Sequence, residues 1–75
     1  MNFRELRKAA GLTQAQLAEQ VGIDQGTISA YEIGTKRPSF DTIPRLALSL
    51  GVTTDDIFLA FEMAKRHKEE QKNGE

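Results

Sequence analysis

The side chains best suited to recognising another molecule stand close together, at Gln25, Thr27, Ser29 and Ala30. A glutamine amide can make paired hydrogen bonds to adenine N6 and N7, a threonine hydroxyl can donate or accept, and an alanine methyl can lie against the methyl group of thymine. None of these residues is charged, and a carboxylate at such positions would repel phosphate. The composition of this stretch favours contact with the base edges of DNA.

Two cations follow this stretch, at Lys36 and Arg37, where they could hold a DNA phosphate. Residues 1–40 carry five basic against four acidic residues, whereas residues 41–75 carry five against seven. The first part of the chain is therefore the better docking face for a polyanion. Charge alone fits an ordinary mixed surface as well, in which these two cations belong to a solvated loop.

Enzymatic chemistry is not expected from this chain. It has no cysteine, its one histidine is His67 in a charged stretch, and it has no Ser/His/Asp set and no phosphate-cradling glycine loop. Asp55 and Asp56 are adjacent at the expected start of a helix, which suits the helix dipole and does not aim two carboxylates at one substrate. We therefore expect neither a metal site nor a cofactor.

The size and composition predict one small cytoplasmic domain. The chain has 75 residues, of which 39% are hydrophobic and 28% charged, and its formal net charge is −1. Such a chain has room for one core, and no segment approaches the roughly 18 apolar residues of a membrane span. Residues 1–4 do not lead into a signal-peptide apolar region. We expect no membrane partner.

Helix signals recur along the chain, and the alternation that marks a strand is nearly absent. The helices are expected to begin at or near Asn2, Thr13, Asp24, Ser39 and Thr53. Thr13 with Gln16, and Thr53 with Asp56, have the spacing of a capping box, and Pro44 falls within about the first turn of its helix, where it removes little bonding. The pattern predicts a compact all-α domain of five helices over residues 1–64. Residues 65–75 are expected to form a charged tail, either a helix end or disordered.

Residues 14–33 have the spacing of two helices held at a steep angle by a tight turn. Ala18 is small, so that the second helix can cross the first closely, and Gly22 supplies the positive φ that the turn requires. Ile28 is the expected buried anchor of the second helix. This is a helix-turn-helix arrangement, in which the second helix, at about residues 24–32, presents an exposed face to a DNA major groove.

With these features the sequence resembles the Cro/C1-type helix-turn-helix family, also called the XRE family. The resemblance covers about residues 3–61 and rests on three segments in order: GLTQAQLAEQVG, IDQGTISAYEIGTKRPSF and LALSLGVTTDDIF. It implies a lambda-repressor-like domain that binds double-stranded operator DNA, usually as a homodimer on a pseudo-palindrome. We accordingly expect a sequence-specific transcriptional regulator that acts as a repressor.

The resemblance also implies roles for single residues. Those expected to contact bases are Gln25, Gly26, Thr27 and Ala30. Those expected to contact phosphates are Gln14, Ser29, Lys36 and Arg37. Arg7 and Glu32 match a pair that forms a partly buried salt bridge between the first and third helices of some relatives. The sequence departs from the family pattern at Gly26 and Ile33, where relatives more often carry a side chain that contacts DNA.

The helix expected after Thr53 carries more large apolar residues than a small core can hide. Phe58 and Phe61 are therefore candidates for a dimer interface. The same surface and the acidic balance would also suit an alternative function, a protein-interaction module such as an antitoxin or a bridging factor. That alternative predicts partner binding that survives Lys36→Ala and Arg37→Ala.

Overall fold

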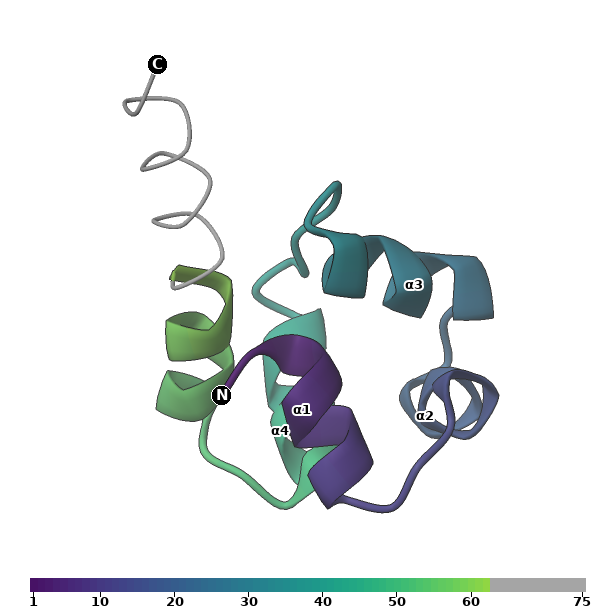
Figure 1. Ribbon diagram of the computed structural model, residues 1–75, viewed down its shortest axis with the longest axis horizontal. Coiled ribbons are helices and arrows are strands. Elements are labelled where there is room, and N and C mark those ends of the chain that lie inside the picture. Colours follow the sequence, from purple (N-terminus) through teal and green to yellow (C-terminus); the bar gives the residue numbers. More distant parts are fainter. Residues whose placement is uncertain (63–75) are drawn as a thin grey trace.

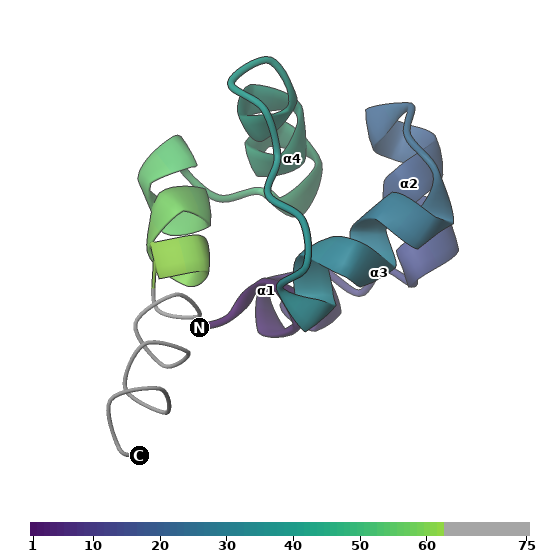
Figure 2. The same cartoon turned by 90° about the horizontal axis from the view of Figure 1, so that it is seen from above.

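The computed structural model describes residues 1–62, so the expected tail at residues 65–75 lies outside them. These residues form helices and no strand. The helices are α1 (Phe3–Ala9), α2 (Gln14–Val21), α3 (Gln25–Ile33), α4 (Thr42–Leu50) and a fifth helical segment over residues 54–62. Figure 1 shows α3 along the upper edge of the molecule, with α1 and α4 below it. In Figure 1 and in the turned view of Figure 2, the fifth helical segment and α2 lie on opposite sides of the molecule. The prediction of a five-helix all-α fold is confirmed.

Three of the helices begin with the same reciprocal pair of hydrogen bonds. In this capping box the N-cap side chain accepts from the N–H three residues on, and the side chain there accepts from the N-cap N–H. The boxes join Asn2 with Glu5, Thr13 with Gln16, and Thr53 with Asp56. The last two confirm the prediction from the sequence. The first was not predicted, although an asparagine three residues before a glutamate gives the same signal.

The start of α3 differs from the prediction in one respect. Asp24 occupies the N-cap position, but its carboxylate makes no capping hydrogen bond. The N–H of Thr27, which a capping side chain would receive, instead donates to the Asp24 carbonyl oxygen at 3.0 Å. The main chain itself satisfies this donor, so the carboxylate is left in solvent.

The prediction that Ser39 caps α4 is wrong. The helix begins at Thr42 with Asp41 as its N-cap residue, after one extra turn of chain. The Ser39 carbonyl oxygen accepts from the N–H groups of Thr42 and Ile43 at 3.0 and 3.1 Å, which continues the helical bonding backward into this turn. Pro44 is the third residue of α4, within the first turn as predicted, where an N–H would have no intrahelical partner.

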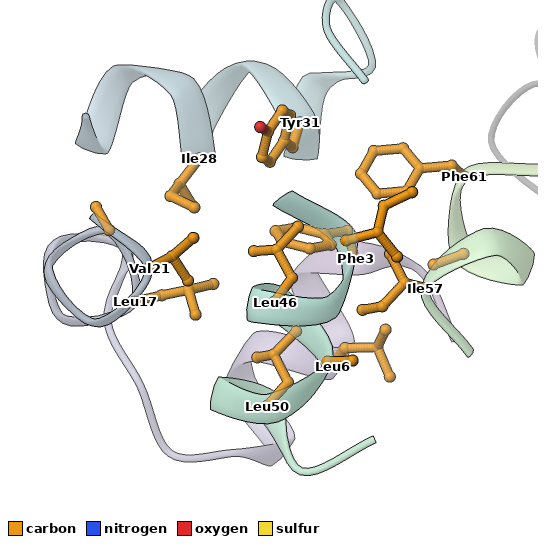
Figure 3. Close-up of a cluster of buried hydrophobic side chains, with 14 residues drawn as sticks. Phe3, Leu6, Leu17, Val21, Ile28, Tyr31, Leu46, Leu50, Ile57 and Phe61 are labelled. Carbon is orange, nitrogen blue, oxygen red and sulfur yellow. The ribbon is translucent and has the colours of Figure 1, made fainter. Parts of the chain in front are cut away.

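The core is built around the inner face of α3. Ile28 has no exposed surface, and Figure 3 shows it directed toward Leu17 and Val21 of α2. Leu46 of α4, also fully buried, lies on the other side of this contact. The prediction that Ile28 anchors the second helix of the motif is confirmed, and this anchor fixes which face of α3 is turned outward.

An aromatic cluster closes the core at the other end of α3. The ring of Phe3 lies 5.7 Å from that of Tyr31 and 5.4 Å from that of Phe61, centroid to centroid, and Tyr31 meets Phe61 edge to face at 5.8 Å. Phe61 is 6% exposed, whereas Phe58 is 41% exposed. Of the two residues expected at a dimer interface, Phe61 is therefore a core residue and Phe58 is available at the surface.

Candidate nucleic-acid interface

The outer face of α3 carries the residues predicted to read bases. Gln25 and Gly26 are exposed, and Thr27, Ser29 and Ala30 are partly exposed. Figure 1 shows α2 nearly end-on while α3 runs across the view, so the two helices cross steeply. The structure thus brings the predicted base-facing residues together on one accessible helix face. Their contact with DNA stays a prediction.

Two glycines of this motif have different roles. Gly22 ends α2 with φ +81° and its N–H donates to the Ala18 carbonyl oxygen at 2.8 Å, which turns the chain sharply into α3. Gly26 lies within α3, and a Cβ built there would meet no atom within 4 Å. The backbone of α3 at Gly26 can therefore approach another molecule closely.

A buried ionic network holds α3 in place. The Arg7 guanidinium of α1 binds the Glu32 carboxylate of α3 through Nε and Nη2, and the two side chains are only 10% and 7% exposed. Arg7 Nη1 also donates to the Leu12 carbonyl oxygen at 2.8 Å. The structure contains the ion pair that the resemblance implies, and the pair links α1 to α3.

Gln14 takes part in the same network. Its Nε2 donates to Glu32 Oε1 at 3.0 Å. One amide hydrogen of the side chain predicted to contact a phosphate is therefore already used in this hydrogen bond. The main-chain N–H of Gln14 is in the first turn of α2, where donors have no intrahelical partner. This N–H and the second amide hydrogen are the groups that Gln14 can offer to a phosphate.

The pKa of Glu32 is lower than the ordinary value for a glutamate. Burial by itself would raise this pKa, but hydrogen bonds from Arg7 and Gln14, and the positive charges of Arg7 and Arg4, outweigh that effect. The folded state therefore binds a proton at Glu32 less readily than the unfolded state does. The resulting contribution to stability is present above the unfolded pKa and is lost as the pH falls through the folded pKa.

We therefore expect Glu32→Gln to abolish part of the pH dependence of unfolding. The stability gap between the wild type and Glu32→Gln should be largest near pH 7 and should shrink as the pH falls below about 4, near the ordinary glutamate pKa. Urea unfolding followed by circular dichroism between pH 7 and pH 3 measures this gap. A gap that stays constant across that range would contradict the role of the ionised carboxylate.

The loop after α3 holds the two predicted phosphate-binding cations. Lys36 and Arg37 are both exposed. Arg37 Nη2 lies 3.4 Å from Glu62 Oε1 of the fifth helical segment, and these side chains are 49% and 48% exposed. Sequence reasoning did not find this ion pair, because the partners are 25 residues apart and no local pattern joins them.

An apolar pocket lies beside this ion pair, between the loop and the fifth helical segment. Its lining consists of Arg37, Pro38, Phe40, Ile43, Ile57, Phe58 and Phe61. Phe40 is 83% exposed, and no sequence pattern singled it out. We call the exposed rings of Phe40 and Phe58, together with Pro38 of the loop, the Phe40–Phe58 surface.

No helix within residues 1–62 is long and apolar enough to cross a bilayer. Within the same range, His, Cys, Asp and Glu side chains do not gather in groups that could hold a metal ion.

The steep α2–α3 crossing, the glycine turn and the outward face of α3 define a helix-turn-helix domain. The chain belongs to the helix-turn-helix family HTH_3, whose family model matches residues 3–57. The resemblance to the Cro/C1-type, or XRE, family is thereby confirmed. This membership places the protein among the helix-turn-helix transcriptional regulators, a class of DNA-binding proteins.

Several known proteins are similar to the chain. An uncharacterized HTH-type transcriptional regulator of Methanothermobacter thermautotrophicus is 47% identical over 61 residues, which cover 80% of this chain and 88% of that protein. The cryptic phage CTXphi transcriptional repressor RstR of Vibrio cholerae is 39% identical over 67% of this chain, but only 45% of RstR is covered. The clp gene regulator ClgR of C. glutamicum superimposes with a TM-score of 0.70 at 26% identity, covering 83% of this chain and 80% of that one.

Proposed function

We propose that the protein binds an operator in double-stranded DNA as a homodimer, with α3 in the major groove, and represses transcription. The observation that carries this proposal is the division of α3 into two faces. Ile28 and Tyr31 are buried, whereas Gln25 and Gly26 are exposed. An α-helix fits the major groove, where the donor and acceptor pattern distinguishes all four base pairs. The relatives named above come from prokaryotes, whose DNA lies in the cytoplasm, and we propose that this protein acts there too.

Phosphate contacts would orient α3 in the groove. The exposed Lys36 and Arg37 follow α3, and the N-terminus of α2 at Gln14 presents its first-turn N–H. Contacts of this kind fix the register of a protein on the duplex, while the base edges supply specificity. Ser29 is partly exposed beside the predicted base-facing residues, and we propose that its hydroxyl contacts a phosphate.

The Phe40–Phe58 surface supports the proposed dimer. A two-fold interface uses the same patch on both partners, so an exposed ring beside an apolar pocket suits self-association. In such a dimer the two recognition helices would lie about 34 Å apart, one turn of DNA. The same surface also supports the second candidate function, a module that binds another protein through an apolar contact.

Gln25→Ala is expected to weaken operator binding about 5- to 150-fold, because a paired hydrogen bond to adenine contributes about 1–3 kcal/mol of discrimination. Binding to unrelated duplexes should hardly change, since phosphate contacts dominate there. Fluorescence anisotropy on a duplex from the upstream region of the protein's own gene, first mapped by footprinting, measures both affinities.

Gln20→Ala is the matched control, because Gln20 is an exposed glutamine of α2 with no proposed contact. Lys36→Ala should weaken binding to the operator and to unrelated DNA by similar factors. A loss in Gln25→Ala that is equal on every duplex would contradict a base contact at this position. The absence of any preference among duplexes for the wild type would contradict the proposed function itself.

A further inference from the structure

We propose that Glu62 limits the affinity of the protein for DNA, because its carboxylate occupies Arg37, a guanidinium that a DNA phosphate would bind. The inference rests on the proposed function and adds to it an internal competitor for one phosphate contact. Arg37 Nη2 lies 3.4 Å from Glu62 Oε1. The partners come from the loop after α3 and from the fifth helical segment, two parts of the chain that also line one pocket.

A carboxylate and a phosphate are competing ligands for the same group. The guanidinium presents its N–H donors in one plane and can donate two parallel hydrogen bonds to either anion. While Glu62 holds Arg37, the carboxylate offsets part of the positive charge that would attract a phosphate. A phosphate must therefore displace Glu62 before it can bind Arg37.

The exposure of the pair makes displacement feasible. The Arg37 and Glu62 side chains are 49% and 48% exposed, so solvent screens their attraction and the contact is weak. DNA can therefore break the Arg37–Glu62 contact, but breaking it lowers the affinity of the protein for DNA. The other cation of the loop, Lys36, forms no ion pair within residues 1–62, so among the described residues the competition concerns Arg37. By contrast, the Arg7–Glu32 pair is buried and has no such exchange open to it.

The test is Glu62→Gln, which keeps the shape of the side chain and removes its charge. We expect operator binding about 1.5- to 5-fold tighter than in the wild type, the range set by an exposed ion pair. The gain should shrink as the salt concentration rises, because screening already weakens the pair in the wild type. In an Arg37→Gln background, Glu62→Gln should give no gain. Fluorescence anisotropy at 50 to 300 mM salt measures these affinities.

Asp55→Asn is the matched control, because Asp55 is exposed on the same helical segment and its loss changes the net charge equally. The proposal is overturned if Asp55→Asn tightens binding as much as Glu62→Gln, or if the gain persists without Arg37. It is also overturned if Glu62→Gln leaves the affinity unchanged. A weaker affinity would overturn it too, because Glu62 would then position Arg37 for DNA. Failure of the proposed function looks different, since then the wild type and every variant either bind no duplex or show no preference among duplexes. Circular dichroism melting confirms that each variant is folded.

Discussion

Replacing Arg7 with methionine is expected to lower the free energy of unfolding by about 3–5 kcal/mol, a large share of the stability of a small domain. Methionine fills most of the space but leaves the Glu32 carboxylate, whose side chain is 7% exposed, without its cation. The carbonyl oxygen of Leu12 loses its donor as well. Urea unfolding at pH 7, followed by circular dichroism, measures the loss.

The double variant Arg7→Met with Glu32→Leu is the informative control. It removes both charges, and an apolar pair of similar volume is often as stable as a buried ion pair. We therefore expect the second substitution to recover much of the lost stability. A double variant as unstable as Arg7→Met alone would contradict the role given to the unpaired Glu32 charge, and would point to the hydrogen bond with Leu12.

Phe61→Ala is expected to lower the free energy of unfolding by about 3–5 kcal/mol, as for other buried aromatic rings. Phe61 is 6% exposed and meets the rings of Phe3 and Tyr31 at 5.4 and 5.8 Å. Phe58→Ala, at a position 41% exposed, should cost less than about 1 kcal/mol. Thermal or urea unfolding of the two variants compares these costs directly.

The effect on self-association should be the reverse of the effect on stability: larger for Phe58 than for Phe61. Phe58→Ala should weaken the proposed dimer, which sedimentation equilibrium measures, while leaving the monomer folded. Equal losses of stability in the two variants would contradict the assignment of Phe61 to the core and Phe58 to the surface. A Phe58→Ala protein that associates as well as the wild type would place the dimer interface elsewhere.

The features that could be predicted from the sequence depend on residues close together in the chain. The capping box of Thr13 and Gln16 and the left-handed turn at Gly22 each need only a few neighbouring residues, and both occur as predicted. Ser39 shows where such reasoning fails. It is a good cap by type, but a further turn of chain precedes α4, and Asp41 takes the N-cap position.

Helix geometry explains why Phe61 is buried while Phe58 is exposed. Ile57 is fully buried, and the residue four positions later lies on the same helix face, whereas the next residue is turned about 100° away. The prediction that both phenylalanines lie at a dimer interface is not consistent with this periodicity, which indicates that Phe61 is buried and Phe58 is exposed.

The contacts that tune the candidate site could not be predicted in this way. Gln14 meets Glu32 across 18 residues of sequence, and Arg37 meets Glu62 across 25. These contacts depend on how α2 and the fifth helical segment pack against the rest, which no local pattern specifies. The outer face of α3 was accessible to prediction, because Ile28 fixed the inner face.

The three capping boxes also bear on how quickly the chain can reach its native state. Each box forms within four consecutive residues, so its formation costs little chain entropy and requires no residue distant in the sequence. Starting a helix is the slow, unfavourable event in helix formation, and elongation takes only nanoseconds per residue. With the start of three helices favoured locally, we expect refolding within the microseconds to milliseconds typical of helical domains rich in local contacts.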